Sequence, residues 1–434
     1  MVKDVIKFII AKKQSEMPFN LIERDIKIPT EENKIITIPG IRRCGKTTMM
    51  ELAVNQLLKD GVSKTRILWI GFDDERLVGM STDELDDIIS SYMEMFPEIS
   101  INETYMFFDE IQLIKNWEYF VLRLYKSYCK HIFVCGSNAT MLSTEVVSAL
   151  RGYPLEYKTF PLSFHEYLRF TGIDGTSHLE SDIAKIKAAF DDYNNFGGFP
   201  EVTLAKSESR KIELLQNYFT AMLYRDLVEH YKISNVSVVN YFIKRLLANI
   251  SKPTSINKIF NDLKSQGFKV SKNDLYLWSD YICNIFLFLR IPKYSKSLAQ
   301  RQSGLKKYYC MDNGIHSSIL LPQSNDNGTK LENTIFLQLC RIRSSVEEIY
   351  YFQDGKECDF VLEDRGKIKN LIQVSWSINN SETKEREVSG LLKASQATNC
   401  DDMTIITHDE EATLRHGDKS IKVVPAWKWL LGRM

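Results

Sequence analysis

The sequence predicts an α/β protein with a parallel sheet in its N-terminal part, a helical and winged-helix middle, and a mixed α/β domain at its C-terminal end. Three observations support this. A chain of 434 residues is long enough for about three folding units. Its 44% hydrophobic and 26% charged residues are ordinary for a globular protein with a sizeable core. Between residues 34 and 160, short apolar segments alternate with helical ones, which is the pattern of a parallel sheet covered by helices.

The N-terminal domain is expected to span residues 1–162. Short apolar segments predict its strands at residues 34–39, 66–72, 104–110, 131–137 and 155–162. The segment in front of them predicts an amphipathic helix that packs on this domain through Val2, Ile6, Ile9 and Ile10.

Three further parts follow along the chain. After Pro161 the pattern becomes helical, interrupted by a turn at residues 196–201, and we expect a helical lid region over residues 163–232. Three helices and then two strands predict a winged-helix-like domain over residues 233–321. A polar break opens the last domain, residues 322–434, where the mixed order of helices and strands predicts a mixed α/β fold.

Charge and hydropathy exclude several classes of protein. Lys plus Arg and Asp plus Glu both total 56, so the net charge directs the chain toward neither nucleic acid nor membrane. The longest strongly apolar stretch, residues 281–289, is too short to cross a bilayer, and the N-terminus lacks a clean signal-peptide core. We therefore expect a cytoplasmic protein without membrane association. The eight cysteines are scattered, which favours buried structural thiols over disulfides or a metal site.

A phosphate-binding motif follows the first expected strand. The segment Gly40-Ile-Arg-Arg-Cys-Gly45-Lys46-Thr47 fits the pattern GxxxxGK[ST], and helical residues come next. Glycines let backbone N–H groups turn around phosphate oxygens, and the helix N-terminus adds partial positive charge. We expect Lys46 to reach the β and γ phosphates, Thr47 to place its hydroxyl on Mg²⁺, and Thr48 to belong to the same nucleotide-binding set. The sequence thus predicts a P-loop that binds ATP with Mg²⁺.

Polar residues at the ends of two later strands complete this prediction. Asp109 is expected to hold Mg²⁺, directly or through water. Glu110 is expected to orient and deprotonate an attacking water. The next strand ends at Ser137 and Asn138, so we expect Asn138 to hydrogen-bond the γ phosphate or the water. A turn-forming Ser-Asn pair is the alternative.

Three arginines are further candidates. Arg43 lies within the loop and is expected to contact phosphate, and DNA or an acidic patch of a partner domain are alternatives for it and for Arg42. Arg151 is expected to supply positive charge to the nucleotide of its own or a neighbouring subunit. An ordinary surface arginine is the alternative.

Several of these segments together resemble a known family. They are GIRRCGKTT, MFFDEIQ, VCGSNATMLS, LRGYPLEYKTFPLSFHEYL, GGFPE and YRDLVEHY. Over nearly its whole length the chain resembles prokaryotic AAA-type ATPases, similar to a branch of the signal-transduction ATPases with numerous domains, whose C-terminal domain is likened to restriction endonucleases. The resemblance implies a Walker A loop at residues 40–47, Walker B acids Asp109 and Glu110, and the sensor Asn138. The family commonly carries an arginine where this chain has Tyr153, so Arg151 is a neighbour of that place and not its equivalent.

A basic segment lies in the winged-helix-like part. Residues 281–310 contain no acidic side chain and six basic ones, namely Arg290, Lys293, Lys296, Arg301, Lys306 and Lys307. Residues 290–307 could neutralise DNA phosphates. Contact within or between subunits is the alternative, and we favour it.

The tail resembles the layout of restriction-endonuclease-like folds. Those enzymes use an acid and then an acid-x-lysine pair, because carboxylates hold Mg²⁺ and the lysine assists the attacking water. Here Glu332 and Asp359 are the first acids, whereas Gln373 and Ser375 occupy the places of the second acid and the lysine. We therefore expect a catalytically silent domain, with Glu332 and Asp359 in reserve as metal ligands. An active site completed by a lysine of residues 367–369 is the alternative.

The sequence as a whole predicts a P-loop ATPase that binds and hydrolyses Mg-ATP and acts as a nucleotide-driven switch, with DNA and a protein partner or a homo-oligomer as candidate partners. An ATP-gated DNA endonuclease is one alternative. A non-hydrolysing nucleotide-binding adaptor in a defence or regulatory complex is another. GTP stays open as the nucleotide, although the chain has no obvious NKxD motif for guanine.

Overall fold

The structure, a computed structural model, describes residues 2–137, 148–321 and 326–433. The chain forms two compact units, residues 1–160 with 284–286 and residues 161–283 with 287–434. The finer division into four domains stays a prediction.

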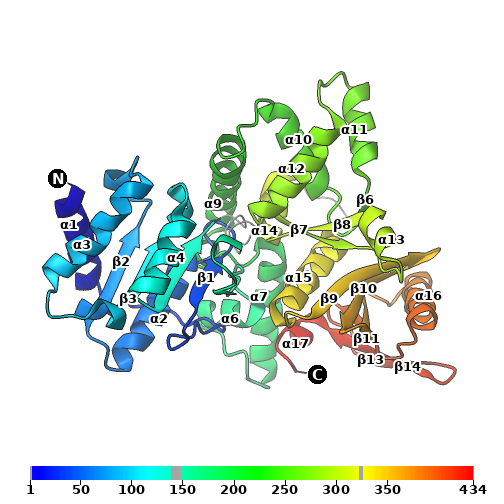
Figure 1. Ribbon diagram of the computed structural model, residues 1–434. Helices are drawn as coiled ribbons and strands as arrows, with labels where there is room; N and C mark the ends of the chain where they lie inside the picture. The colour runs from blue at the N-terminus through cyan, green and yellow to red at the C-terminus, as the bar shows by residue number, and fades with distance from the viewer. Residues whose placement is uncertain (1, 138–147, 322–325, 434) are drawn as a thin grey trace. The chain divides into compact units, whose positions relative to one another are not determined.

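A five-stranded parallel sheet is the centre of the first unit, and its strands follow the order β2-β3-β4-β1-β5 (Figure 1). The strands are β1 (Ile35–Pro39), β2 (Ile67–Gly71), β3 (Tyr105–Asp109), β4 (His131–Gly136) and β5 (Pro154–Glu156). The described helices are α1 (Val2–Ser15), α2 (Lys46–Lys59), α3 (Asp86–Met95) and α4 (Trp117–Ser127). Short 3₁₀ turns lie at Lys64–Arg66, Glu75–Leu77, Thr82–Leu85, Ile101–Glu103 and Ile111–Leu113. Because parallel strands share one carboxyl edge, the loops after β1, β3 and β4 open on the same side.

Helices cover both faces of this sheet, and side chains alternate along its strands accordingly. On one face, α1, α3 and α4 pack over a core that includes Ile9 of α1 with Met106 and Phe108 of β3. On the other face, Val54 of α2 packs in a core with Phe107 of β3. This two-faced burial explains why β3 is apolar throughout until its acids.

The fifth strand is shorter than the sequence predicts, since it ends at Glu156. The chain still follows β1, because Tyr157 N donates to Thr37 O and Thr159 N donates to Pro39 O, both at 2.8 Å. Pro161 has no N–H group to continue this pairing. The backbone around Thr159 is thereby held beside the start of the phosphate loop.

The second unit begins with helices. They are α6 (Phe164–Thr171), α7 (Glu180–Phe196), α8 (Pro200–Thr203) and α9 (Glu208–Ala221). The first begins with a capping box, in which the side chains of Ser163 and Glu166 each bond the backbone N–H of the other. The last continues as a π-helical segment over Met222–Glu229.

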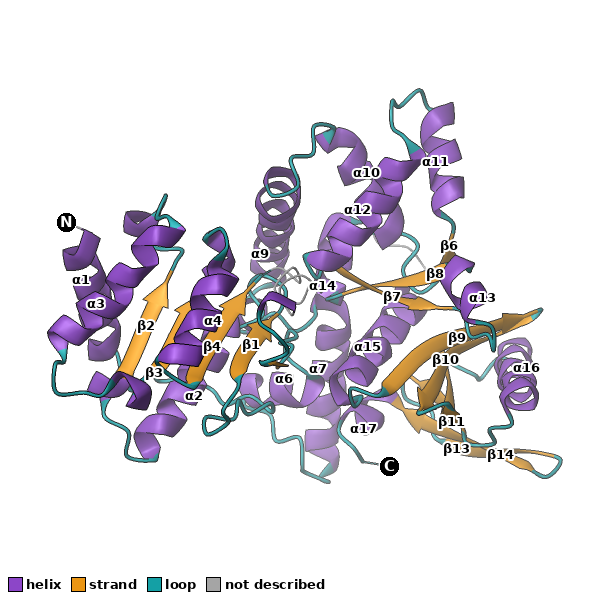
Figure 2. Cartoon of the chain, viewed as in Figure 1, coloured by secondary structure: helices purple, strands orange, loops and turns teal. Residues whose placement is uncertain are grey.

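A three-stranded antiparallel sheet with the order β6-β8-β7 comes next in the second unit (Figure 2). Its strands are β6 (Pro253–Thr254), β7 (Phe288–Pro292) and β8 (Lys306–Cys310), and the helices of this part are α10 (Val236–Leu247), α11 (Ile256–Ser265), α12 (Lys272–Asn284) and α13 (Leu298–Ser303). The three expected helices and two expected strands are present. The short strand β6 and the helix α13 are additions that the sequence reading missed. Strand β8 is central and is paired on both sides.

The C-terminal part contains a mixed six-stranded sheet in the order β13-β14-β12-β11-β10-β9 (Figure 2). Its strands are β9 (Glu347–Asp354), β10 (Lys356–Asp364), β11 (Lys367–Ser375), β12 (Met403–Thr407), β13 (Ala412–His416) and β14 (Lys419–Pro425). The helices are α14 (Asn313–Ile319), α15 (Asp326–Ile342), α16 (Ser381–Thr398) and α17 (Ala426–Leu430). Helix α16 packs on β10 and β11, and α15 contacts both β11 and β8. This packing brings β8 close to the six-stranded sheet.

The turn GGFPE after α7 requires glycine at its first position, Gly197. Gly197 has φ 75° and ψ −160°, a region that only glycine adopts readily. A Cβ atom on Gly197 would lie 1.8 Å from Asp312 Oδ1. The carboxylate of Asp312 accepts hydrogen bonds from Gly198 N at 2.7 Å and from Gly314 N at 2.8 Å. The turn is therefore built around a buried aspartate that also caps α14.

Within the described ranges, no helix combines the length and the hydropathy that a bilayer span requires. The eight cysteines are free thiols.

We predict that Gly197→Ala lowers the free energy of unfolding by about 3 kcal/mol or more, because the new methyl group both forces a strained backbone and meets the Asp312 carboxylate. Denaturant unfolding followed by circular dichroism measures this. Gly172→Ala is the matched control, since Gly172 also ends a helix at positive φ but a Cβ there meets nothing within 4 Å. Equal losses in the two variants would refute the role of the Asp312 contact.

Candidate functional site

The loop between β1 and α2 is shaped by close packing and by left-handed residues. A Cβ on Gly40 would lie 2.3 Å from Thr159 O, so only glycine fits at this position. Arg43 and Gly45 have φ values of 68° and 97°, and Gly45 is the residue directly before α2. The loop thus turns back over the first turn of α2, where amide N–H groups have no partner within the helix. Such an end attracts anions, and phosphate above all.

Lys46 is buried at the first position of α2. Its Nζ donates to Ile41 O at 3.2 Å and lies 3.8 Å from Glu110 Oε1. Burial opposes the charged form, but neighbouring groups, including Cys44 and Glu110, raise the pKa of Lys46 above its ordinary value. Lys46 is therefore a cation held at the base of the loop.

Thr47 and Asp109 form the next contact. The Thr47 hydroxyl donates to Asp109 Oδ2 at 2.7 Å, and the Cys135 thiol donates to Asp109 Oδ1 at 2.5 Å. Burial raises the pKa of Asp109 above its usual range, and the hydrogen bonds from Cys135 and Thr47 oppose this shift. A hydroxyl oxygen and a carboxylate oxygen side by side are a donor set that suits Mg²⁺. The residues present therefore fit the magnesium ion that the sequence predicts.

Glu110 is oriented by its neighbours. It follows β3 in a left-handed conformation with φ 51°. Its Oε2 accepts hydrogen bonds from the side-chain amide of Gln112 and from the Ser137 hydroxyl, the latter at 3.3 Å. Ser137 directly follows β4. The structure thus gathers polar side chains from the ends of β1, β3 and β4 at one sheet edge, as the sequence predicts.

The other predicted residues differ in what the structure says of them. Asn138 lies outside the described residues. Arg43 is exposed and Thr48 is half-buried beside the loop. Arg151 is exposed on a left-handed turn with φ 54°. Among the described residues, no side-chain hydrogen bond or ion pair joins Arg151 to the loop or to the acids after β3.

Sequence reasoning missed some residues of this site. Gln112 and Cys135 contact the two acids directly. Thr47 and Asp109 also open onto a cavity of about 390 Å³ that is lined by α1 and by the residues after β2, among them Lys13 and Asp73. Asp73 follows an apolar strand as Asp109 does, so the same signal could have identified it.

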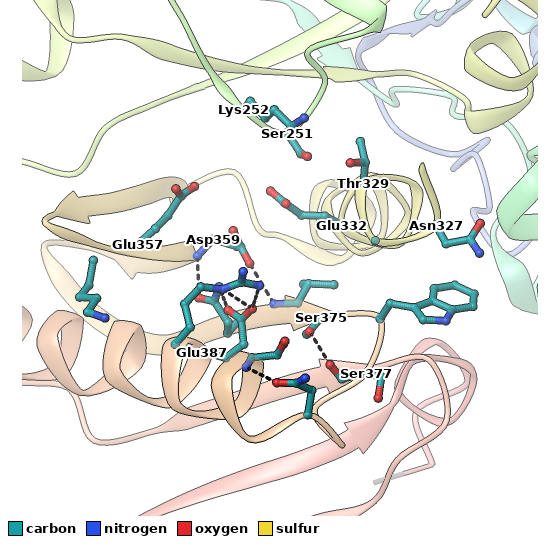
Figure 3. Close-up of a pocket in the computed structure, with 18 of the residues that line it drawn as sticks. Ser251, Lys252, Asn327, Thr329, Glu332, Glu357, Asp359, Ser375, Ser377 and Glu387 are labelled. Carbon is teal, nitrogen blue, oxygen red and sulfur yellow. Dashed lines mark hydrogen bonds and ion pairs between the residues drawn. The ribbon is translucent and has the colours of Figure 1, made fainter. Parts of the chain in front are cut away.

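A second polar cavity lies in the second unit. Its volume is about 1110 Å³, and Figure 3 shows Glu332 projecting from a helix and Asp359 from a strand along its wall. Gln373 and Ser375 also line this cavity. The Gln373 side-chain oxygen accepts a hydrogen bond from Asp359 N at 3.2 Å, and its amide nitrogen donates to Glu387 Oε2 at 2.6 Å. The four tail residues chosen from the sequence thus lie in one place.

An unexpected lysine belongs to this cavity wall. Lys307 of β8 has no exposed surface, and its Nζ lies 3.0 Å from Glu332 Oε1, 2.7 Å from Glu357 Oε1 and 3.0 Å from Asp359 Oδ1. We call Glu332, Glu357 and Asp359 the carboxylate cluster. Among the described residues, no group of three or more His, Cys, Asp or Glu side chains has the geometry to hold a metal ion. In this cluster the cation is a lysine.

The lysines of residues 367–369, the alternative from the sequence, are not among the residues that line this cavity. Lys369 instead pairs with Asp364 at 2.6 Å and with Glu347 at 3.3 Å.

The basic segment 290–307 is largely occupied within the chain. Arg290 pairs with Asp280 at 2.8 Å, Arg301 pairs with Glu363 at 3.3 Å, and Lys307 is buried in the carboxylate cluster. The sequence counted these as available positive charges. Their acidic partners lie elsewhere in the sequence, so the ion pairs cannot be read from the segment alone. The positive charge that the segment presents to a partner is therefore smaller than +6.

Comparison with known proteins identifies the N-terminal part. The family model described as an AAA domain matches residues 32–168, and a domain of unknown function, DUF8612, matches residues 187–326. The AAA match covers the strands and the loop described above.

Two relatives extend the similarity along the chain. The uncharacterized protein MJ1544 of Methanocaldococcus jannaschii is 33% identical over 432 residues, covering 97% of this chain and 92% of that protein. An uncharacterized protein of Haemophilus influenzae is 28% identical over 344 residues, covering 79% of this chain and 83% of that protein.

Among solved structures, the Aeropyrum pernix ORC1 protein in complex with DNA matches with 12% identity and a TM-score of 0.31, covering 73% of this chain and 90% of that one. This low score does not establish a common fold over the whole chain. The match to MJ1544 extends over nearly the whole chain at 33% identity and shows that the two proteins are homologous. The chain therefore belongs to the family of MJ1544 from Methanocaldococcus jannaschii and contains an AAA domain at residues 32–168.

Proposed function

We propose that the first unit binds ATP together with Mg²⁺ at the loop of residues 40–47 and hydrolyses it. The observation that carries this proposal is that four side chains lie together at one edge of the parallel sheet, namely Lys46, Thr47, Asp109 and Glu110. A cation, a hydroxyl and two acids in this arrangement are what phosphoryl transfer to water requires.

Each side chain has its own task in this proposal. The Lys46 ammonium binds the β and γ phosphates, and the amides of the loop surround the same oxygens. Mg²⁺, when held by Thr47 and Asp109, neutralises charge on the phosphates. The Glu110 carboxylate orients a water molecule in line with the γ phosphate and takes its proton. Lys46 Nζ lies 3.8 Å from Glu110 Oε1, so the proposed phosphate-binding ammonium and the proposed general base are neighbours.

A nucleotide-driven switch is the form of action that we propose for the whole chain, since its sequence contains the GxxxxGK[ST] pattern only once. In this proposal the nucleotide state changes the contacts that the winged-helix-like part and the tail make. A non-hydrolysing adaptor would bind nucleotide with negligible turnover, so measured phosphate release separates the two.

Lys46→Ala is expected to weaken binding of Mg-ATP by about 100-fold or more, because the loop loses its phosphate-binding cation. Calorimetry with a slowly hydrolysed ATP analogue measures the affinity, and GTP in a parallel titration tests nucleotide choice. Lys59→Ala, at the exposed end of the same helix, is the control. If Lys46→Ala bound as tightly as the control, the phosphate site would have to lie elsewhere.

Glu110→Gln is expected to keep nucleotide binding and to reduce turnover by roughly 100-fold or more, because the amide cannot accept the proton of water. Phosphate release under saturating ATP measures turnover. Glu103→Gln, an exposed acid just before β3, serves as the control. Equal rates in wild type and Glu110→Gln would remove the assigned base.

For the tail we propose a restriction-endonuclease-like domain that is catalytically silent. The favouring observation is the common cavity of Glu332, Asp359, Gln373 and Ser375, in which an amide and a hydroxyl stand where an active enzyme needs a carboxylate and a lysine. DNA association through residues 290–307 is a weaker proposal, because Arg290, Arg301 and Lys307 already have partners within the chain.

We expect the wild-type chain to leave supercoiled plasmid DNA intact with Mg²⁺ or Mn²⁺, with or without ATP, in a gel assay of nicking. Asp359→Ala is included as a comparison. Nicking by wild type that disappears in Asp359→Ala would contradict the silent domain and favour an ATP-gated endonuclease. Phosphate release with and without duplex DNA then tests DNA association separately.

A further inference from the structure

We propose that Gln112 is a positioning residue for ATP hydrolysis: its side-chain amide holds one oxygen of Glu110 and leaves the other oxygen to take the proton of the attacking water. The inference rests on the proposed function of the first unit and adds to it the residue that orients the base. Gln112 acts through Glu110 and not on the substrate.

The two oxygens of the Glu110 carboxylate have different surroundings. Oε2 accepts hydrogen bonds from the Gln112 side-chain amide and, at 3.3 Å, from the Ser137 hydroxyl. Oε1 lies 3.8 Å from Nζ of Lys46, the ammonium that we expect at the β and γ phosphates. Oε1 is therefore the oxygen that lies toward the phosphate-binding cation, and Oε2 is the oxygen that is held.

The contact between Gln112 and Glu110 is built by the backbone of one short turn. Glu110 has a left-handed conformation with φ 51° and directly precedes the 3₁₀ turn of Ile111–Leu113. Leu113 N donates to Glu110 O at 3.1 Å, which closes the turn. A left-handed conformation costs free energy in a residue other than glycine, and such residues cluster at active sites. The turn thus sets the direction of the base and places the amide that holds it.

The other polar atom of the Gln112 amide indicates what this residue does. Gln112 Oε1 is buried and, within the part of the chain that the structure describes, accepts no hydrogen bond. The reverse orientation of the amide would bring its oxygen against the Glu110 carboxylate, so the N–H group must face Glu110. A buried oxygen without a partner destabilises the folded chain and requires a reason. Donation of the amide N–H to the proposed base is that reason.

Holding Oε2 removes a freedom that would slow the reaction. A free glutamate side chain rotates and presents a suitable oxygen for only part of the time, whereas an oriented one is ready when water is in line. In the step itself, the water oxygen bonds to the γ phosphorus, the bond from this phosphorus to the β–γ bridging oxygen breaks, and its electron pair leaves with ADP. Glu110 Oε1 takes the proton of the water.

The test compares the wild-type chain with Gln112→Met, which keeps the length of the side chain and loses the N–H donor. Because the base is then present but no longer oriented, kcat for phosphate release should fall about tenfold or more. The affinity for a slowly hydrolysed ATP analogue, measured by calorimetry, should change by less than about twofold, since the phosphate loop keeps its residues.

A double-mutant cycle with Glu110→Gln identifies the route of this effect. In the Glu110→Gln chain no base remains to be oriented, so adding Gln112→Met should lower the residual turnover by less than about twofold. A merely structural role of Gln112 would lower turnover by the same factor in both backgrounds.

Gln56→Met is the matched control, because the Gln56 amide also donates to a carboxylate, that of Asp60, at an exposed position. This variant should leave kcat unchanged. Gln112→Glu is the second variant if circular dichroism shows that Gln112→Met folds poorly. It keeps the shape of the side chain but cannot donate at neutral pH, so its kcat should fall at least as far.

Unchanged kcat in both Gln112 variants, or equal losses with and without Glu110→Gln, would overturn the inference and leave the proposed function standing. Wild-type turnover in Glu110→Gln itself would remove the base, and the role of Gln112 with it.

Discussion

Each charge that leaves water in this chain must meet an opposite charge or a suitable hydrogen-bond partner, and both candidate sites are arranged by this constraint. In the first unit, buried Lys46 lies beside Glu110, and buried Asp109 is bonded by Thr47 and Cys135. In the second unit, the carboxylate cluster surrounds Lys307. The two solutions differ in one respect. In the first, the Asp109 carboxylate is bonded, among the described residues, only by a hydroxyl and a thiol, whereas in the second a lysine of the chain neutralises the acids.

Much of the first unit could be predicted from the sequence because its signals are local. A strand, a glycine loop and a helix follow one another directly at Gly40 to Thr47, and Asp109 and Glu110 end an apolar strand. The end of the fifth strand was less predictable, since pairing beyond Glu156 depends on backbone contacts with Thr37 and Pro39. Gln112 and Cys135 were missed because their contacts with Glu110 and Asp109 depend on the direction in which each side chain points, which the sequence does not show.

The second unit could be predicted in its elements but not in its electrostatics. Glu332, Asp359, Gln373 and Ser375 follow a recognisable order and do meet at one cavity. Lys307 lies 25 and 52 residues from Glu332 and Asp359 in the chain, so no spacing rule connects them. In the sequence, Lys307 is only one of six basic residues in a segment expected to be an exposed wing. In the fold it is the most buried charge of that segment.

The sequence of strand β8 is compatible with more than one pairing register. Its sequence Lys306-Lys307-Tyr308-Tyr309 repeats each residue type once, so sliding the strand by one position would present a lysine and a tyrosine to the acids again. The far side of the strand breaks this degeneracy, because Tyr308 and Ser279 of α12 share a hydroxyl contact at 2.7 Å, and a slip would bring a lysine there. The contact with α12 therefore fixes the register of β8, and this register decides that Lys307 and not Lys306 is buried.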